Sequence, residues 1–195
     1  MTVHALSRSV NHMKNNPPLR HTIVTQTLHW VIACLVLAAF ILGPEGSERQ
    51  VYAAPHFERQ LHETLGLLVF ALSMLRILWR LFDQRPTFSP TSAWMTTASK
   101  AVQAALYLLL FAVPATAIAG AWLEGHPLTL LAGLTIAPWV ALNHALGETL
   151  AIIHTWAADT LLYLAGLHAL AAIYHHVVLK DAVLSSMLPK WIPLR

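Results

Sequence analysis

Long apolar runs, separated by short polar stretches, are the main pattern of this sequence. Four of them approach or exceed the roughly 20 apolar residues that a helix needs to cross a hydrocarbon core about 30 Å thick. They cover about residues 27–43, 61–81, 101–123 and 150–179. None alternates apolar and polar residues as a membrane barrel strand does. The pattern predicts an all-α integral membrane protein, built as a bundle of four transmembrane helices.

Two apolar stretches depart from a simple span. The fourth run is longer than a crossing needs, so we expect its helix to tilt or to emerge from the bilayer at one end. Residues 128–142 are also apolar, but the stretch is short and contains Gly133 and Pro138. We expect it to form an interfacial or re-entrant loop.

The predicted domain organisation is a membrane domain at residues 21–190, with tails at residues 1–20 and 191–195. No small-residue cleavage site follows the first apolar run, so we expect the first helix to remain as an anchor.

The distribution of Lys and Arg predicts the orientation. If both termini lie inside, ten of these residues fall on the inner side and two, Arg49 and Arg59, fall on the outer side. Loops that remain in the cytoplasm carry such an excess of basic residues. We therefore expect both termini to be cytoplasmic.

Composition supports this class and excludes several others. Hydrophobic residues make up 56% of the chain and charged residues 11%, against about 25% charged in a soluble domain. Lys and Arg number only 12, too few for a nucleic-acid-binding surface. The single cysteine, Cys34, excludes an intrachain disulfide, an iron–sulfur cluster, a Cys-based zinc site and the C-x-x-C-H haem attachment motif.

Histidine is unusually frequent, with 12 residues. Six fall in the inner tail or the outer loops, where we expect solvated side chains: His4, His12, His21, His56, His126 and His144. The other six fall on the predicted spans or at their ends, where ionisable side chains are rare and are functional candidates.

Four of these membrane histidines pair by depth. His154 and His168 are 14 residues apart, which is about 21 Å along a helix and close to the same face. His62 stands at the outer start of the second span, and His29 stands at the inner start of the first. We therefore expect His62 to face His154 near the outer surface and His29 to face His168 near the inner surface.

Two nitrogen ligands at each level favour haem iron. No thiolate or carboxylate completes a zinc shell, because Glu63 follows His62 directly and points about 100° away around the helix. A porphyrin supplies four equatorial nitrogens and needs only two axial ligands from the protein. With both axial positions filled, the expected chemistry is electron transfer.

Other readings of these residues remain open. A single membrane histidine can simply donate a hydrogen bond to a neighbouring helix, although four histidines matched at two depths make this less favourable. His175 is a rival to His168, but it lies only five residues from Lys180 and so nearer the surface. We expect His175 and His176 to be interfacial polar groups or proton carriers.

The sequence also resembles a known family. The residues that carry the resemblance are Leu28-His29-Trp30, Leu61-His62-Glu-Thr-Leu-Gly66, Leu75-Arg76-Ile-Leu-Trp79-Arg80, His154 through His168, His175-His176, Lys180-Asp181 and Met187-Leu-Pro189. They are similar to those of the bacterial cytochrome b561 family of inner-membrane di-haem proteins, over about residues 20–190.

The resemblance implies two haem b groups, with His29 and His168 as axial ligands of the inner iron and His62 and His154 as ligands of the outer iron. It also implies electron transfer between ubiquinone or ubiquinol and a periplasmic partner. Some members resemble superoxide oxidases, which take an electron from superoxide and reduce ubiquinone. Arg76 and Arg80 are candidate contacts for the inner haem propionates, because Arg forms charge-assisted forks with carboxylates. Snorkelling at the inner surface is the alternative role for both.

Other functions remain open. The outer loops are acidic, whereas an anionic substrate such as superoxide would be steered by a basic surface. A non-catalytic anchor subunit for a dehydrogenase or hydrogenase would carry the same haems. A proton relay or transporter would use the membrane histidines without haem.

Overall fold

The computed structural model describes residues 20–44, 57–83 and 92–192. Its long helices are α2 (Ile23–Ile41), α4 (Phe57–Phe82), α5 (Ala93–Leu123) and α6 (His144–Tyr174). Between α5 and α6 lie β1 (Leu128–Thr129), the 3₁₀ turn η1 (Leu131–Gly133) and β2 (Thr135–Ile136). After α6 follow the π-helical turn η2 (His175–Leu179) and the short helix α7 (Val183–Ser186).

Four helical segments are long and apolar enough to cross a membrane, namely α2, α4, α5 and α6 with η2. Each overlaps one of the four predicted spans, so the predicted fold class is confirmed. All four begin earlier than the apolar pattern indicates, and in α2 and α6 a polar side chain caps the first turn. The Thr22 hydroxyl accepts a hydrogen bond from the Thr25 backbone N–H (3.4 Å), and the Asn143 side chain accepts one from Leu146 (3.2 Å). His144, expected in a loop, is therefore the first residue of α6.

Residues 128–142 do not form a fifth spanning helix in this structure. Strands β1 and β2 pair antiparallel, with Leu128 opposite Ile136. The resulting hairpin packs on the first turns of α4, where the Leu131 backbone N–H donates to the Thr64 hydroxyl at 3.0 Å.

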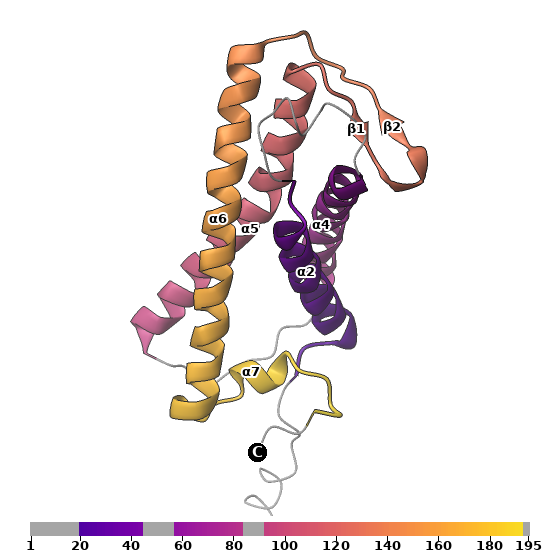
Figure 1. The fold of residues 1–195 in the computed structure, drawn as a ribbon. Coiled ribbons are helices and arrows are strands. Elements are labelled where there is room, and N and C mark those ends of the chain that lie inside the picture. Colours follow the sequence, from indigo (N-terminus) through magenta and orange to yellow (C-terminus); the bar gives the residue numbers. More distant parts are fainter. Residues whose placement is uncertain (1–19, 45–56, 84–91, 193–195) are drawn as a thin grey trace, which may run out of the picture.

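The four long helices are arranged as two packed pairs (Figure 1). Helix α2 lies beside α4, and α5 lies beside α6. The hairpin lies at one end of the bundle, which we call the hairpin end, and α7 lies at the opposite end, which we call the α7 end. Alternating helix directions place the starts of α4 and α6 at the hairpin end and the start of α2 at the α7 end.

The core is one apolar layer across the middle of the bundle. Ile32, Val69, Leu110 and Leu161 form a buried cluster, and each comes from a different long helix. Elsewhere large apolar side chains point outward. Tyr163 is 75% exposed and Leu108 is 70% exposed. Apolar side chains that face outward along helices with internally satisfied backbones suit contact with lipid.

The chain segment around α7 is tied to the start of α2 by polar contacts. The Gln26 amide donates to the Ser186 carbonyl at 2.9 Å, and the Trp30 indole donates to the Met187 carbonyl at 2.8 Å. The Ser186 carbonyl also accepts from the His21 backbone N–H at 3.1 Å, so these bonds serve carbonyls at the end of a short helix, which have no partner within the helix itself.

Candidate functional site: two histidine pairs

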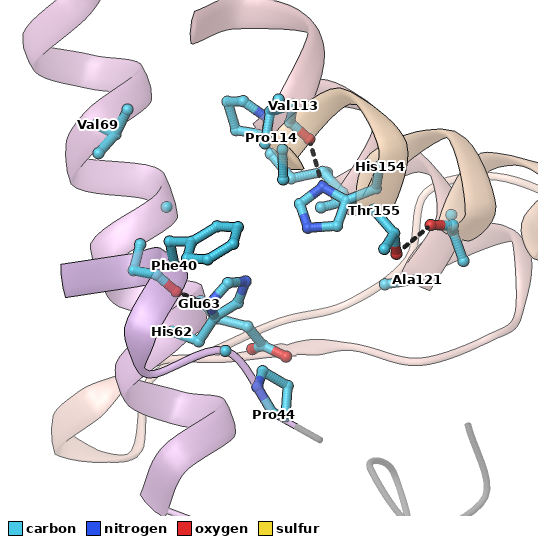
Figure 2. Close-up of a pocket in the computed structure, with 18 of the residues that line it drawn as sticks. Phe40, Pro44, His62, Glu63, Val69, Val113, Pro114, Ala121, His154 and Thr155 are labelled. Carbon is cyan, nitrogen blue, oxygen red and sulfur yellow. Dashed lines mark hydrogen bonds between the residues drawn. The ribbon is translucent and has the colours of Figure 1, made fainter. Parts of the chain in front are cut away.

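At the hairpin end, His62 of α4 faces His154 of α6. Their ring centroids are 6.1 Å apart and their planes are nearly perpendicular, at 89°. Nδ1 of His62 lies 2.8 Å from the Ala39 carbonyl, and Nδ1 of His154 lies 2.8 Å from the Val113 carbonyl. A carbonyl can only accept, so each Nδ1 carries a hydrogen and the Nε2 of each neutral ring keeps a free lone pair. Figure 2 shows the two rings pointing toward one another.

At the α7 end, His29 of α2 faces His168 of α6. The ring centroids are 6.3 Å apart and the planes make an angle of 86°. Nδ1 of His29 lies 2.9 Å from a guanidinium nitrogen of Arg76 on α4. Arginine can only donate, so this ring nitrogen accepts the bond. The two pairs therefore have the same spacing but different neighbours.

The spacing of both pairs fits one metal ion held between two imidazoles. A metal–imidazole nitrogen bond of about 2 Å on each side puts the two ring centroids about 6 Å apart. Among the described residues, no group of three or more His, Cys, Asp or Glu side chains could hold a metal ion. The arrangement thus suits an ion that brings its own equatorial ligands, as haem iron does.

The two pairs lie at different levels of the same helix faces. On α6, His154, Leu161 and His168 follow at intervals of seven residues, which is close to two helical turns. On α4, His62, Val69 and Arg76 follow at the same interval. Because Leu161 and Val69 belong to the buried apolar layer, this layer separates the two pairs.

A cavity of about 590 Å³ surrounds the hairpin-end pair, a size typical of ligand pockets. Its lining comes from all four long helices and is mostly apolar. Gly66, one turn beyond His62, lines it, and no atom lies within 4 Å of the place that a Cβ would take. The cavity therefore reaches the backbone of α4, which leaves room for a flat macrocycle between the rings.

Two charged residues that line this cavity, Arg59 and Glu63 of α4, are bound to the hairpin. Arg59 is 7% exposed and donates to the Thr129 hydroxyl at 2.9 Å. Glu63 accepts a bond from the Thr129 backbone N–H and lies 3.7 Å from Arg59. Arg59, counted as an outer-loop residue from the sequence, is thus a buried residue of α4. Glu63 is turned to the hairpin and away from the pair, as its position after His62 predicts.

Asp159 of α6 also lines the cavity, and the sequence reasoning missed it. It is half-buried and lies two residues before Leu161 of the apolar layer. The signal was present in the sequence, because a carboxylate inside a predicted span is itself a functional candidate.

A cluster of cationic and polar side chains lies beside the α7-end pair. Arg76 and Arg80 lie over the ring of Tyr107, at 5.7 and 5.6 Å from its centroid. Arg80 also donates to the Tyr107 hydroxyl and to the Gln103 side-chain oxygen, both at 3.3 Å. In the described part of the chain, neither guanidinium has a carboxylate within 4.0 Å. The cluster can therefore receive an anionic group.

His175, the rival to His168, has a different partner. Its Nδ1 lies 2.5 Å from the carboxylate of Asp181, and the second oxygen of that carboxylate accepts from the Val183 backbone N–H at 3.0 Å. The π-helical turn η2 begins at His175. The ring that faces His29 belongs to His168.

The comparison with protein families agrees with this geometry. The chain matches the family model described as prokaryotic cytochrome b561 over residues 20–190. The chain belongs to the prokaryotic cytochrome b561 family. It is therefore a membrane cytochrome that binds haem and takes part in electron transport.

Individual relatives support the family membership along nearly the whole chain. Cytochrome b561 homolog 2 of Escherichia coli is 29% identical over 177 residues, covering 90% of this chain and 94% of the relative. The probable superoxide oxidase CybB of Yersinia pestis is 31% identical, covering 84% and 92%. Cytochrome b562 of Cereibacter sphaeroides is 32% identical, covering 86% and 94%.

Proposed function

We propose that this cytochrome b561 carries electrons across the bacterial inner membrane by means of two haem b groups. His62 and His154 would be the axial ligands at one level, and His29 and His168 at the other. The observation that carries the proposal is the pair of ring spacings, 6.1 and 6.3 Å, at two levels of one face of α6. A haem iron held at each level supplies a one-electron carrier.

The charge pattern supports an outward orientation of the hairpin end. Lys180 and Lys190 lie in the chain segment that follows α6 at the α7 end, and Arg20 donates to the Leu188 carbonyl there at 3.0 Å. Cytoplasmic segments carry such a basic excess. We therefore assign His62 and His154 to the outer site and His29 and His168 to the inner site, with both termini in the cytoplasm.

The chain's own residues adapt each site to a haem. At the outer site, the Ala39 and Val113 carbonyls hold Nδ1–H and so direct the Nε2 lone pair toward the iron position. At the inner site, a ring that binds iron through Nε2 carries its hydrogen on Nδ1. The Arg76 guanidinium would then donate to another acceptor, and we propose that Arg76 and Arg80 bind the haem propionates.

Ubiquinone or ubiquinol is the proposed partner in the lipid phase. Reduction of a quinone consumes protons as well as electrons, so a proton carrier is needed near the inner site. His175 lies seven residues beyond His168 on a similar face of the helix and is hydrogen-bonded to Asp181. This orientation by a carboxylate suits a histidine that exchanges protons.

Superoxide is the proposed donor on the outer side, because one relative is named a probable superoxide oxidase. Two superoxide ions would each lose one electron to become dioxygen, and the two electrons with two protons would convert ubiquinone to ubiquinol. The exposed carboxylates at the hairpin end, Glu58 and Glu148, favour a cationic periplasmic partner instead. The two donors are separable by assay.

The first experiment is a reduced-minus-oxidised optical spectrum of the purified chain, with haem measured per polypeptide. Two low-spin haem b groups per chain are expected. One haem per chain would contradict the two-site proposal, and none would favour a proton relay. Superoxide-dependent reduction of ubiquinone by the isolated chain would then support the oxidase, whereas turnover only with a co-purified soluble subunit would support an anchor role.

A further inference from the structure

Arg59 is a buried cation in the wall of the cavity around the hairpin-end histidine pair. It is 7% exposed and lines the cavity together with His62, which follows it by three residues on α4. The rest of the lining is mostly apolar. Burial of a guanidinium costs free energy unless acceptors or an anion surround it. An arginine in this wall therefore indicates a place where an anionic group is bound.

The printed contacts of Arg59 with the protein lie on the side of the hairpin. Nη2 donates to the Thr129 hydroxyl at 2.9 Å, and this acceptor carries no charge. The Glu63 carboxylate lies 3.7 Å from Nε, which is longer than a hydrogen bond. Glu63 itself accepts from the backbone N–H and the hydroxyl of Thr129. These contacts hold the guanidinium in the cavity wall without a close ion pair to Glu63.

The charges around the cavity single out Arg59 as the position for an anion. Among the described residues, it is the only lysine or arginine in the lining. The acids of the lining are Glu63, Glu148 and Asp159. Haem b carries two propionate side chains, which are carboxylates, and charge repulsion disfavours them beside these acids. The arginine is the lining residue that attracts a propionate.

The order of residues along α4 gives a direction to this attraction. Helix α4 begins at the hairpin end of the bundle (Figure 1). Along the helix axis, Arg59 lies about 4.5 Å nearer to that end than His62 does, and Gly66 lies about 6 Å farther from it. Gly66 leaves open space at the cavity wall. The order suits an apolar macrocycle beside Gly66 with its charged edge beside Arg59.

We propose that Arg59 binds a propionate of the outer haem and so turns the charged edge of the macrocycle toward the hairpin end. A guanidinium binds a carboxylate through two parallel N–H···O bonds. Its positive charge also stabilises the reduced iron. This inference rests on the proposed two-haem function and assigns to the outer site the counterpart of the arginines at the inner one.

The first readout is the reduction potential of the outer haem in a spectroscopic redox titration of the purified holoprotein. The outer haem is identified as the one lost in His62→Ala. Arg59→Gln should raise its oxidised-to-reduced ratio at fixed ambient potential about tenfold, which is a potential about 59 mV lower. Arg59→Lys keeps the cation and should shift the ratio less. The inner haem should keep its potential in both variants.

The second readout is the propionate bending vibration in resonance Raman spectra, which responds to hydrogen bonds of the propionate. Subtraction of the spectrum of His62→Ala isolates the band of the outer haem. Both Arg59→Gln and Arg59→Lys should shift this band, because lysine cannot reproduce the two parallel bonds of the guanidinium. If Arg59→Gln retains too little outer haem to titrate, the band in Arg59→Lys decides, and an unshifted band there would overturn the proposal.

Thr129→Val is the matched control for a purely structural role of Arg59. It breaks the bond between Arg59 and the hairpin and keeps the cation in the cavity wall. The outer potential and the propionate band should therefore change much less than in Arg59→Gln. Equal changes in Thr129→Val and Arg59→Gln would show that Arg59 only anchors the hairpin.

Haem content separates this inference from the proposed function. A wild-type chain with fewer than two haems would refute the function itself. Two haems per chain, with the outer potential and the propionate band unchanged in Arg59→Gln, would refute the role of Arg59 and leave the cytochrome intact.

Discussion

The two histidine pairs that we propose as the outer and inner sites are nearly identical as ring pairs but opposite in electrical surroundings. Centroid distances of 6.1 and 6.3 Å differ little. At the outer pair, both rings donate to backbone carbonyls, and a carboxylate, Asp159, lines the cavity. At the inner pair, Arg76 contacts His29, and Arg80 lies close by on Tyr107.

This difference would give the two proposed haems different properties within one helix bundle. Carbonyl acceptors raise the basicity of a ligating imidazole, which favours the oxidised iron. Guanidinium groups favour the reduced iron, because they interact with its charge in a region of low dielectric. We therefore expect the inner haem to have the higher potential, which drives electrons from the outer site to the inner one.

The largest effect is expected from the ligands themselves. His62→Ala and His154→Ala should each remove the same haem, and His29→Ala and His168→Ala should each remove the other, leaving about one haem per chain because an iron needs both of its axial ligands. Haem content and the difference spectrum measure this. His175→Ala is the control, and a loss of one haem in that variant with retention of both in His168→Ala would show that the inner ligand is misassigned.

A second, large effect should be confined to the outer site. Gly66→Leu places a side chain in the cavity beside His62, where no atom lies within 4 Å of the Cβ position, and should exclude most of the outer haem. Gly166→Leu is the matched control, since Gly166 is an exposed glycine of α6 with equally open space. Optical spectra should show the inner haem unchanged in both variants. Full outer occupancy in Gly66→Leu would place the macrocycle elsewhere.

A moderate effect should distinguish the inner site by charge. Arg76→Gln removes a cation close to the inner pair and should lower the inner haem's potential by about 59 mV, a tenfold change in its oxidised-to-reduced ratio. The outer haem, on the far side of the apolar layer, is the internal reference in the same redox titration. Arg76→Lys, which keeps the charge, should shift the potential less. A shift of the outer haem alone would reverse the proposed contrast.

The smallest effect concerns His21, which lies just before α2 at the α7 end. Burial lowers the pKa of His21, the charges of Arg80 and Arg76 lower it further, and Asp83 opposes them. As the pH falls, the unfolded chain therefore takes up a proton on His21 before the folded chain does. The contribution of His21 to stability is thus present above its ordinary pKa of 6.5 and is lost as the pH falls below it. On acidification, the melting temperature of the wild type should fall more than that of His21→Asn. An equal fall in both proteins would contradict this role.

Much of the architecture follows from local sequence alone. Apolar runs long enough to span a bilayer must be helical, because only internal hydrogen bonds satisfy the backbone in lipid. The same reasoning with helical periodicity predicts that His154 and His168 share a face and that His62 and His29 belong to different levels. The early helix starts were harder to predict, because Thr22 and Asn143 extend the helices past their apolar residues through single capping bonds.

Only the tertiary structure shows which residues, distant in the chain, become the partners of the site residues. The carbonyls of Ala39 and Val113, which orient the outer rings, lie 23 and 41 residues from their histidines. The hairpin that binds Arg59 and Glu63 could not be inferred from apolar runs, since its pairing depends on chain packing against α4. The sequence determined the spans, the candidate ligands and their depths, because these depend on composition and helical period. The surroundings that make the two sites different required the fold, because they arise from contacts between helices.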